Sequence, residues 1–347
     1  MNRNRRSSKR KIIVATIAAL FAILLFWLVL HLVVDRGLLD EQFGDSGEWG
    51  DEEDEQITLL FGEDQDEVYV SDDNVDTYLI MGTDAGGEFV DEEHSGTLAD
   101  FLALLIIDNT TEKYGIIQID RNTMMQMTEL TGEEELDGEV FKQQICLAHW
   151  YGEDDSQRND NTMAMVSDLF GYLPIDNYYA INMENMGRVN EALGGVEVTI
   201  DTDMTNVDPA FVQGTTVLLT DDQAEKFLRA RMSVGEGTNK ERMSRQTQYM
   251  QKAYSMVMAQ LKENPEYVND LYDSLSDVIQ REETGSNLSR MANHIVQYES
   301  QGILQIDGKT TTADTQGDGE EHEEFYADQQ SIIDTLGKIM NLRKSEE

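Results

Sequence analysis

The clearest hydrophobic pattern is an uninterrupted apolar run near the N-terminus, from Ile12 to Val34, which contains no charged residue. About 20 apolar residues are enough for a helix to cross the hydrocarbon core of a bilayer. The eleven residues before it carry six basic side chains and no acidic one. Because positive charge marks the cytoplasmic side, the pattern predicts a cytoplasmic tail over residues 1–11, a transmembrane helix over residues 12–34 and an exported remainder.

A cleaved signal peptide is the alternative interpretation of this run. The apolar regions of signal peptides usually span about 7–15 residues and end at a small-residue cleavage site. Here the run is longer, and residues 35–40 contain no A-x-A pattern. Both observations favour an uncleaved anchor, so we expect a single-pass protein of the cell membrane with an extracellular C-terminal domain.

Beyond the anchor the pattern changes twice. Residues 35–75 are dominated by Asp, Glu and Gly, which is typical of a solvated acidic spacer, although two short apolar stretches within it are compatible with strands. From residue 76 the chain becomes globular, and we expect one domain over residues 76–342. Three apolar runs predict buried strands, at Thr77–Gly82, Phe101–Asp108 and Tyr114–Asp120, with a hairpin-like turn at residues 109–113.

Helical spacing of apolar residues alternates with further short strands along the rest of the chain. Expected helices are Val140–Trp150, Asn161–Phe170, Glu184–Leu193, Thr220–Arg231, Lys240–Lys262, Leu271–Ile279, Leu288–Tyr298 and Ala327–Leu342. Expected strands are Tyr178–Asn182, Val196–Ile200 and Ile303–Ile306, and the polar stretch at residues 307–324 is expected to be an exposed loop. The mixture lacks a regular strand–helix–strand cadence and predicts an α/β protein of the α+β type, a mixed central sheet flanked by helices.

Charge and cysteine content restrict the function. The net charge is -42, and without the six basic residues of the tail the remainder holds 20 Lys and Arg against 68 Asp and Glu, or -48. Such a surface repels nucleic acid, so we expect no nucleic-acid partner. The single cysteine, Cys146, excludes an intramolecular disulfide and cysteine-rich zinc sites. An exported domain without disulfides fits a bacterium with one membrane, the Gram-positive type.

Basic residues are concentrated in one segment, Phe227–Gln246. It contains Arg229 and Arg231 at the end of one expected helix, and Arg242 and Arg245 on one face at the start of the next. Helix N-termini favour anions, and guanidinium groups bind phosphate through two parallel hydrogen bonds. The cluster predicts a phosphate or pyrophosphate clamp. The alternative, that these arginines pair with the abundant surface acids, remains open from the pattern alone.

Two aspartates and another arginine lie at expected strand ends. Asp84 and Asp100 are placed where carboxylates could hold Mg²⁺, although loop capping is the simpler interpretation of either residue in so acidic a chain. Arg121 follows the third strand and points either into a cleft or to solvent. Sequence templates for serine hydrolases, P-loop proteins and zinc proteases are absent. His149 and Cys146 are expected to be packed in the core.

These segments, in this order, resemble the LytR-CpsA-Psr family of cell-envelope proteins. The matching stretches are YLIMGTD, ADFLALLIID, YGIIQIDRNT, ICLAHWYG, VNEALGGVEVTI and LTDDQAEKFLRARM followed by ERMSRQ. The resemblance covers residues 76–342, and members also have a cytoplasmic N-terminus and one membrane helix. No single stretch is specific, but the ordered set is.

The resemblance implies a phosphotransferase that moves a glycopolymer, such as teichoic acid or capsule, from a polyprenyl (pyro)phosphate carrier onto peptidoglycan, with the lipid tail in an apolar pocket. Asp84 and Asp100 would take the metal-side roles with Mg²⁺ (or Mn²⁺), and Asp100 could instead act as base. The phosphates would be bound by Arg121, Arg229, Arg231, Arg242 and Arg245, with Gln246 beside them.

Four positions depart from the family pattern. Ala85 stands where an arginine is often found, Asp120 and Asn122 replace a proline and an aspartate, and Asn239 replaces an aspartate. Amides still form hydrogen bonds but carry no charge, and Asp120 adds an acid beside the expected clamp. These changes motivate an alternative hypothesis, a non-catalytic member that binds polyprenyl phosphates and acts in envelope regulation, as a transcriptional attenuator.

Overall fold

The computed structural model describes residues 56–62, 65–84, 97–127, 130, 141–231, 234–263, 274–281, 297–315, 317 and 319–345. The predicted tail, the predicted transmembrane helix and most of the predicted spacer lie outside these residues. Within the described ranges, no helix is long and apolar enough to cross a membrane. The described structure begins at Gln56 rather than Asp76, because the two apolar stretches of the expected spacer form a hairpin of β1 (Gln56–Phe61) and β2 (Glu67–Asp72), and β2 also pairs with β15 (Arg343–Lys344).

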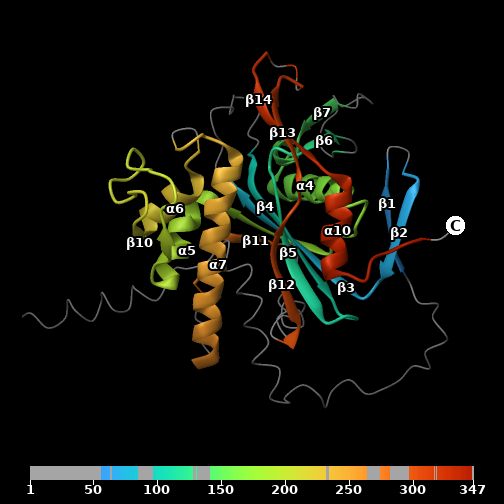
Figure 1. Cartoon of the computed structure of the whole chain (residues 1–347), viewed down its shortest axis with the longest axis horizontal. Coiled ribbons are helices and arrows are strands. Elements are labelled where there is room, and N and C mark those ends of the chain that lie inside the picture. The colour runs from blue at the N-terminus through green and yellow to red at the C-terminus, as the bar shows by residue number, and fades with distance from the viewer. Residues whose placement is uncertain are drawn as a thin grey trace, which may run out of the picture.

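A six-stranded mixed sheet forms the centre of the protein, in the order β11-β8-β3-β4-β5-β12 (Figure 1). The strands β3, β4 and β5 are antiparallel neighbours, β8 runs parallel to β3, and β12 runs parallel to β5. The bounds are β3 (Val75–Thr83), β4 (Ala99–Asp108), β5 (Lys113–Ile119), β8 (Asn177–Asn182), β11 (Ile279–Arg281) and β12 (Glu299–Gln305). The three predicted apolar strands are therefore three of the four interior strands.

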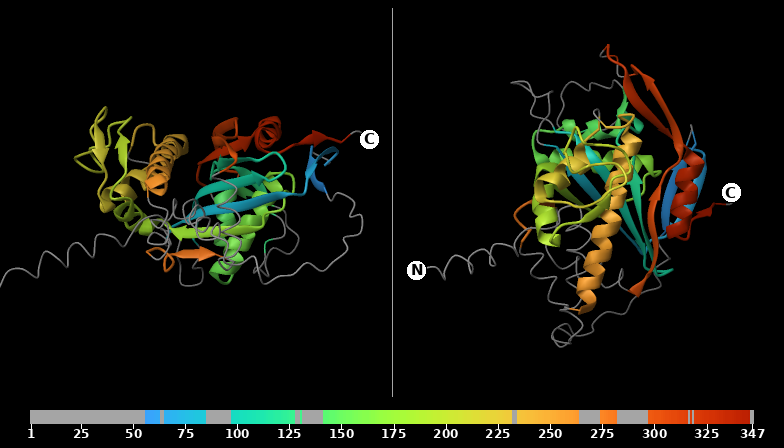
Figure 2. Two further views of the ribbon diagram at one scale, coloured as in Figure 1. Left: turned by 90° about the horizontal axis from the view of Figure 1, so that it is seen from below. Right: turned by 60° about the vertical axis from the view of Figure 1, so that its left-hand side comes forward.

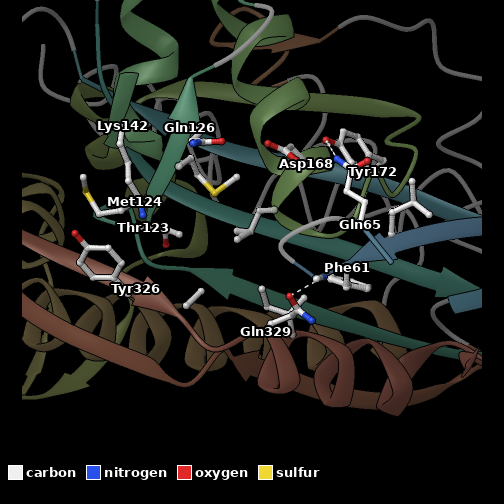
Figure 3. Close-up of a pocket in the computed structure, with 16 residues that line it drawn as sticks. Phe61, Gln65, Thr123, Met124, Gln126, Lys142, Asp168, Tyr172, Tyr326 and Gln329 are labelled. Carbon is white, nitrogen blue, oxygen red and sulfur yellow. Dashed lines mark hydrogen bonds between the residues drawn. The ribbon is translucent and has the colours of Figure 1, made fainter. Parts of the chain in front are cut away.

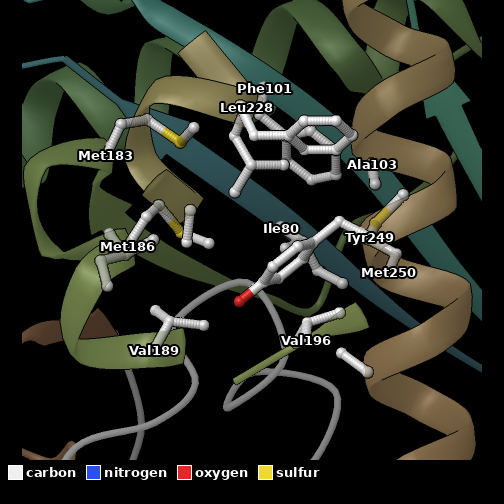
Figure 4. Packing of buried hydrophobic residues seen from close by; sticks show 14 of the residues in the cluster. Ile80, Phe101, Ala103, Met183, Met186, Val189, Val196, Leu228, Tyr249 and Met250 are labelled. Atoms are coloured by element: carbon white, nitrogen blue, oxygen red, sulfur yellow. The ribbon is translucent and has the colours of Figure 1, made fainter. Parts of the chain in front are cut away.

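Both faces of this sheet are buried, which explains why its central strands are apolar throughout. Along β3, Tyr78 and Ile80 enter one hydrophobic cluster while Leu79 and Met81 enter the other, as strand alternation requires. The first cluster packs against α5 (Met186–Leu193), α6 (Asp221–Arg229) and α7 (Asn239–Glu263), and Figure 4 shows Tyr249 of α7 at its centre. The second packs against α4 (Asp155–Leu169) and α10 (Gln329–Ile339).

Short hairpins and 3₁₀ turns complete the fold. They are β6 (Met124–Met127) with β7 (Phe141–Gln144), η1 (Ile145–Trp150), η2 (Met183–Asn185), β9 (Glu197–Thr199) with β10 (Thr216–Leu218), and β13 (Gly308–Ala313) with β14 (His322–Ala327). Figure 1 places α5, α6 and α7 to the left of the sheet and α10 to its right, and the right-hand view of Figure 2 shows the β13–β14 hairpin extending past the sheet.

Three expected elements differ from the structure. The segment at 140–150 is a strand followed by a 3₁₀ turn, because the amides of Ile145 and Cys146 donate to the carbonyls of Thr123 and Arg121. The polar stretch at 307–324 forms most of the β13–β14 hairpin instead of an open loop. Residues 274–279, expected as part of the helix Leu271–Ile279, form turns and the start of the edge strand β11, while most of the expected helix at 288–298 lies outside the described residues.

His149 is a satisfied core residue, as expected, and it connects two parts of the fold. Its Nδ1 lies 2.8 Å from the hydroxyl of Thr97, and its Nε2 lies 3.0 Å from Oδ1 of Asn159 in α4. The ring is 2 % exposed. Burial lowers the pKa of His149 below its ordinary 6.5, and the hydrogen bonds oppose this shift only in part. The folded protein therefore favours the neutral imidazole.

This shift predicts a pH dependence of stability. Below pH 6.5 the unfolded chain binds a proton at His149 that the folded chain resists, so the wild-type protein loses stability relative to His149→Gln as the pH falls from 6.5. The measurement is urea unfolding of both proteins between pH 5 and pH 8 (roughly the range over which histidine changes charge). The difference in unfolding free energy between the two proteins cancels the contribution of the many carboxylates, which titrate in both. A difference in unfolding free energy that stays constant across this range would contradict the prediction.

Candidate active site

The strand order brings three of the predicted site residues to one edge of the central sheet. β3 and β4 are antiparallel, and so are β4 and β5, so the ends of β3 and β5 lie beside the start of β4. Asp84 directly follows β3, Asp100 is the second residue of β4, and Arg121 lies two residues after β5. The N-terminus of α7 reaches the same edge, where Gln118 of β5 donates from Nε2 to the carbonyl of Met243 at 3.3 Å.

Asp100 is held between two arginines. Its Oδ1 accepts a hydrogen bond from Nη1 of Arg121, and its Oδ2 lies 3.3 Å from Nη1 of Arg242. The side chains are 12 % exposed for Asp100 and Arg121 and 4 % exposed for Arg242. Burial alone would raise the pKa of Asp100, but Arg121 and Arg242, with smaller contributions from Arg229 and Arg231, lower it below its ordinary value. Asp100 is therefore ionised near neutral pH.

The same electrostatic relation acts on Arg242. Burial, together with the positive charges of Arg121 and Arg231, lowers the pKa of Arg242 to about 10, while Asp100 raises it. Arg242 stays protonated near neutral pH. Since its neighbouring cations repel it and Asp100 attracts it, the carboxylate is what allows two guanidinium groups to be buried side by side.

A second set of contacts extends from this centre through Asn239, the first residue of α7. Its Oδ1 accepts from Nη2 of Arg242 at 2.7 Å, its Nδ2 donates to Oδ1 of Asp120 at 2.6 Å, and its backbone N–H lies 3.2 Å from both carboxylate oxygens of Glu323. Oε2 of Glu323 also accepts from Nη2 of Arg231 at 3.1 Å. One continuous network therefore connects Asp100, Arg242, Asn239, Glu323 and Arg231.

The two departures at Asp120 and Asn239 compensate each other. Burial, and more weakly the charge of Glu323, raises the pKa of Asp120, while the amide of Asn239 lowers it by donating a hydrogen bond. An ionised carboxylate accepts hydrogen bonds and cannot donate them, so an aspartate at position 239 would repel Asp120 at this distance. The amide at 239 is what accommodates the extra acid at 120.

Arg229 and Asp84 lie at the margin of the cluster. Arg229 forms an ion pair of 2.9 Å with Glu225 on its own helix and is 34 % exposed, yet its charge acts on both Asp84 and Asp100. Asp84 exchanges hydrogen bonds with Leu98, accepting from its N–H at 3.3 Å and donating to its carbonyl at 3.1 Å. Burial and the nearby charge of Asp100 raise the pKa of Asp84 above its ordinary value.

Arg245 does not join the cluster. Its Nε donates to the carbonyl of Phe227 at 3.0 Å and its Nη2 to the carbonyl of Ala230, so it fastens α7 to the end of α6. Gln246 is 2 % exposed and accepts from Nε2 of Gln118 at 3.5 Å, beneath the cluster. These two residues position the segment that carries the other arginines.

The arginines also present unused donors. Among the described residues, the Nε–H groups of Arg121, Arg231 and Arg242 are buried and have no hydrogen-bond acceptor, and the same is true of Nε2 of Gln246. Buried polar groups in native proteins normally have partners. Several unpaired donors, three of them on cations, give this edge of the sheet the chemistry of an anion-binding site.

Two cavities are lined in part by β5, by α7 or by the residues that follow β5. The larger, of about 570 Å³, begins at Thr123, two residues after Arg121, and Figure 3 shows Gln126, Lys142, Tyr326 and Gln329 around it. Its lining is mainly polar. The smaller, of about 200 Å³, lies between α7 and the strands β5 and β12, and it is mainly apolar; its lining includes Tyr114, Ile116, Met250, Tyr254 and Ile303.

Sequence reasoning missed Glu323 and Gln118. Glu323 is 84 residues away in sequence from its partner Asn239, and it lies in a stretch with too few apolar residues to predict a strand. Gln118 lies inside an apolar run, and a lone amide within a buried strand is the one local signal that could have identified it. It also accepts from Thr247 and from Gln305, at 2.6 and 2.9 Å.

The compensation between positions 120 and 239 can be tested. Asn239→Asp removes a donor and places two carboxylates in contact, so it should lower the free energy of unfolding by about 1–3 kcal/mol at pH 7. Asp120→Asn in the same protein should restore most of that loss, because the amide can then donate in the opposite direction. Denaturant unfolding of the four proteins of the cycle measures this coupling. Additive effects of the two substitutions would contradict it.

Comparisons with known proteins identify the family of this chain. The profile of the LytR_cpsA_psr family matches residues 50–341. The polyisoprenyl-teichoic acid–peptidoglycan teichoic acid transferase TagU of Bacillus cereus (strain AH820) is 31 % identical over 173 residues, which is 50 % of this chain and 50 % of TagU. The chain thus spans about half the length of the curated relatives it matches.

Solved structures share the fold at low sequence identity. Protein gbs0355 from Streptococcus agalactiae superposes with a TM-score of 0.59 at 19 % identity, covering 77 % of this chain and 86 % of that one. TagV of B. subtilis gives 0.53 at 17 % identity, covering 77 % and 96 %, and TagT bound to LI-WTA gives 0.54 at 16 % identity, covering 77 % and 90 %. The fold is the mixed sheet flanked by helices expected above, and since the family profile covers most of the sequence, the chain belongs to the LytR_cpsA_psr family.

Proposed function

We propose that this protein is a membrane-anchored phosphotransferase that moves a glycopolymer from a polyprenyl (pyro)phosphate carrier to peptidoglycan. The observation that carries the proposal is the buried Asp100–Arg121–Arg242 cluster, whose arginines still have unused donors. Curated relatives are named as polyisoprenyl-teichoic acid–peptidoglycan teichoic acid transferases, which supports the same kind of reaction.

Phosphoryl transfer depends mainly on positioning and on stabilising the charge of the transferred group. In the proposed reaction Arg121 and Arg242 bind the phosphate oxygens, and Arg231 and Arg229 add positive charge at the margin. Asp100 fixes both guanidinium groups. With its two oxygens engaged and its pKa lowered, Asp100 is a weak proton acceptor.

Both ends of the substrate have a suitable surface. The apolar cavity beside Met250 and Tyr254 lies on the α7 side of β5 and suits part of a polyprenyl chain. The cavity of about 570 Å³ beyond Thr123 is within the usual range for small-molecule sites. Its amides and phenols offer donors and acceptors, which suits sugar units of the glycan. An anchor helix at residues 12–34 would hold the cluster near the outer leaflet, where a lipid-linked substrate presents its phosphates.

The residues present also fit a divalent cation. Mg²⁺ takes oxygen ligands and is often bound by one or two carboxylates together with substrate phosphates. Asp84 and Asp100 are close enough for the charge of Asp100 to raise the pKa of Asp84, an interaction that a cation would offset. Among the described residues there is no group of three or more Asp, Glu, His or Cys side chains placed for a metal. Asp84 and Asp100 would therefore hold Mg²⁺ or Mn²⁺ with phosphate oxygens, and the ion would neutralise developing negative charge.

A transfer assay tests the proposed reaction. The full chain in nanodiscs, Mg²⁺, a polyprenyl-pyrophosphate glycan and peptidoglycan should yield linked glycan and released lipid phosphate. Arg121→Ala should slow transfer by about 10²–10³-fold, the usual effect of removing one donor to a developing negative charge. Arg188→Ala is the matched control, because Arg188 of α5 pairs with Asp277, away from the cluster, and its side chain is 33 % exposed.

The outcomes separate the hypotheses. Transfer that is unaffected by Arg121→Ala would refute the assignment of the cluster. Binding of the lipid pyrophosphate without any transfer, in conditions where an active relative works, would favour the non-catalytic binding protein. That alternative draws on the full engagement of Asp100 by arginines, which leaves it poorly placed to act as a base.

Metal binding can be measured without the reaction. In titration calorimetry with Mn²⁺ and inorganic pyrophosphate, Asp84→Asn should weaken binding of the cation about tenfold or more, since one of two charged ligands is lost. Asp72→Asn is the control, because Asp72, at the end of β2, forms its ion pair with Arg343 of β15. Equal Mn²⁺ affinity in the wild-type protein and Asp84→Asn would refute the assignment.

A further inference from the structure

The β13–β14 hairpin brings an acidic side chain into the arginine cluster. Its backbone is fastened beside Arg121, because the N–H of Phe325 donates to the carbonyl of Asn122 at 2.9 Å and Thr123 forms a β-bridge to Phe325. The carbonyl of Glu323 also accepts from Nε2 of Gln144 at 2.7 Å. These anchors use backbone groups and Gln144, so they are independent of the Glu323 carboxylate.

The carboxylate of Glu323 occupies a position with two anion-binding features. One is the N-terminus of α7, a helix of 25 residues, whose first N–H lies 3.2 Å from both carboxylate oxygens. The other is Arg231, at 3.1 Å. Free N–H groups and the helix dipole attract anions, and a guanidinium group strengthens that attraction. A phosphate group that binds to Arg231 would need this same position.

We propose that Glu323 is a built-in anion that competes with the phosphate ligand for Arg231 and the start of α7, and so determines how much negative charge a ligand needs in order to bind. This inference rests on the proposed function, in which the ligand is a phosphate ester. The carboxylate is 18 % exposed and Arg231 is 22 % exposed, so the side chain can turn toward solvent while the hairpin stays in place.

Competition of this kind discriminates between ligands. A monophosphate can bind to Arg121 and Arg242, but it has no second phosphate group to bind Arg231. Glu323 therefore stays paired with Arg231. A pyrophosphate presents a second phosphate group, which carries more charge and more acceptor oxygens than one carboxylate. It can therefore displace Glu323 and engage both halves of the network. Glu323 thus lowers the affinity for the pyrophosphate-linked substrate, which must displace it, more than the affinity for the monophosphate that remains after transfer.

The test compares Glu323→Gln with the wild-type full chain in nanodiscs, by calorimetric titration with geranylgeranyl pyrophosphate and geranylgeranyl phosphate. Removing the competing charge should tighten binding of the pyrophosphate, which otherwise has to displace Glu323, by about tenfold, the equivalent of one charge-assisted hydrogen bond. Binding of the monophosphate, which leaves Glu323 in place, should tighten less, so the preference for the pyrophosphate should widen. Glu321→Gln is the matched control, because it removes the same charge from an exposed position of the same hairpin.

Several results would overturn the inference. Unchanged or weaker pyrophosphate binding by Glu323→Gln would show that the carboxylate does not compete, and slower transfer with unchanged affinity would assign it a role in the reaction instead. Glu323→Asp keeps the charge but shortens the reach to Arg231, so it should give an intermediate gain and serves if the glutamine variant is unstable. If neither ligand binds to the wild-type protein or to any variant, the proposed function itself fails.

Discussion

The pairing of Asp100 with Arg121 and Arg242 is the interaction on which the rest of the site depends. It joins the start of one central strand, the loop after the next strand and the first turn of the long helix α7. Burying two cations side by side is unfavourable unless a negative charge is shared between them. Because the sheet fixes Asp100, both arginines are placed by the fold and need little reorganisation to meet an anion. The other arginines contribute from the margin, one through Glu323 and one through its long-range charge.

Much of this fold can be predicted from the sequence, and the reasons are local. The three apolar runs become β3, β4 and β5 because strands buried on both faces need continuous apolar side chains. Helix α6 follows Thr220, whose capping box with Gln223 is present in the structure. What could not be predicted depends on distant partners. The β13–β14 hairpin contains few apolar residues, and its pairing is recognisable only once Asn122 and Thr123 are in place.

The arginine cluster shows how far helical spacing can be trusted. Arg242 and Arg245 are three residues apart and were expected to share one task. Three residues turn a helix by about 300°, so their side chains diverge by about 60°. That divergence is enough to direct Arg242 to Asp100 and Arg245 to the carbonyls at the end of α6. Asp120 and Asn239, which both differ from the family pattern, are explained by a contact between them, because the amide of Asn239 donates a hydrogen bond to the carboxylate of Asp120.

The strand β5 connects the apolar cavity between α7 and the sheet to the arginine cluster, so its length separates the two sites. Ile116 of β5 lines the cavity, and Arg121 lies two residues beyond the end of the strand. At about 3.3 Å per residue the two are separated by about 17 Å. In the proposed function, a carrier whose phosphates lie at Arg121 reaches that cavity only if its hydrocarbon tail is at least as long. The length of β5 then sets the minimum length of the lipid tail, so that shorter prenyl chains would be bound only through their phosphates.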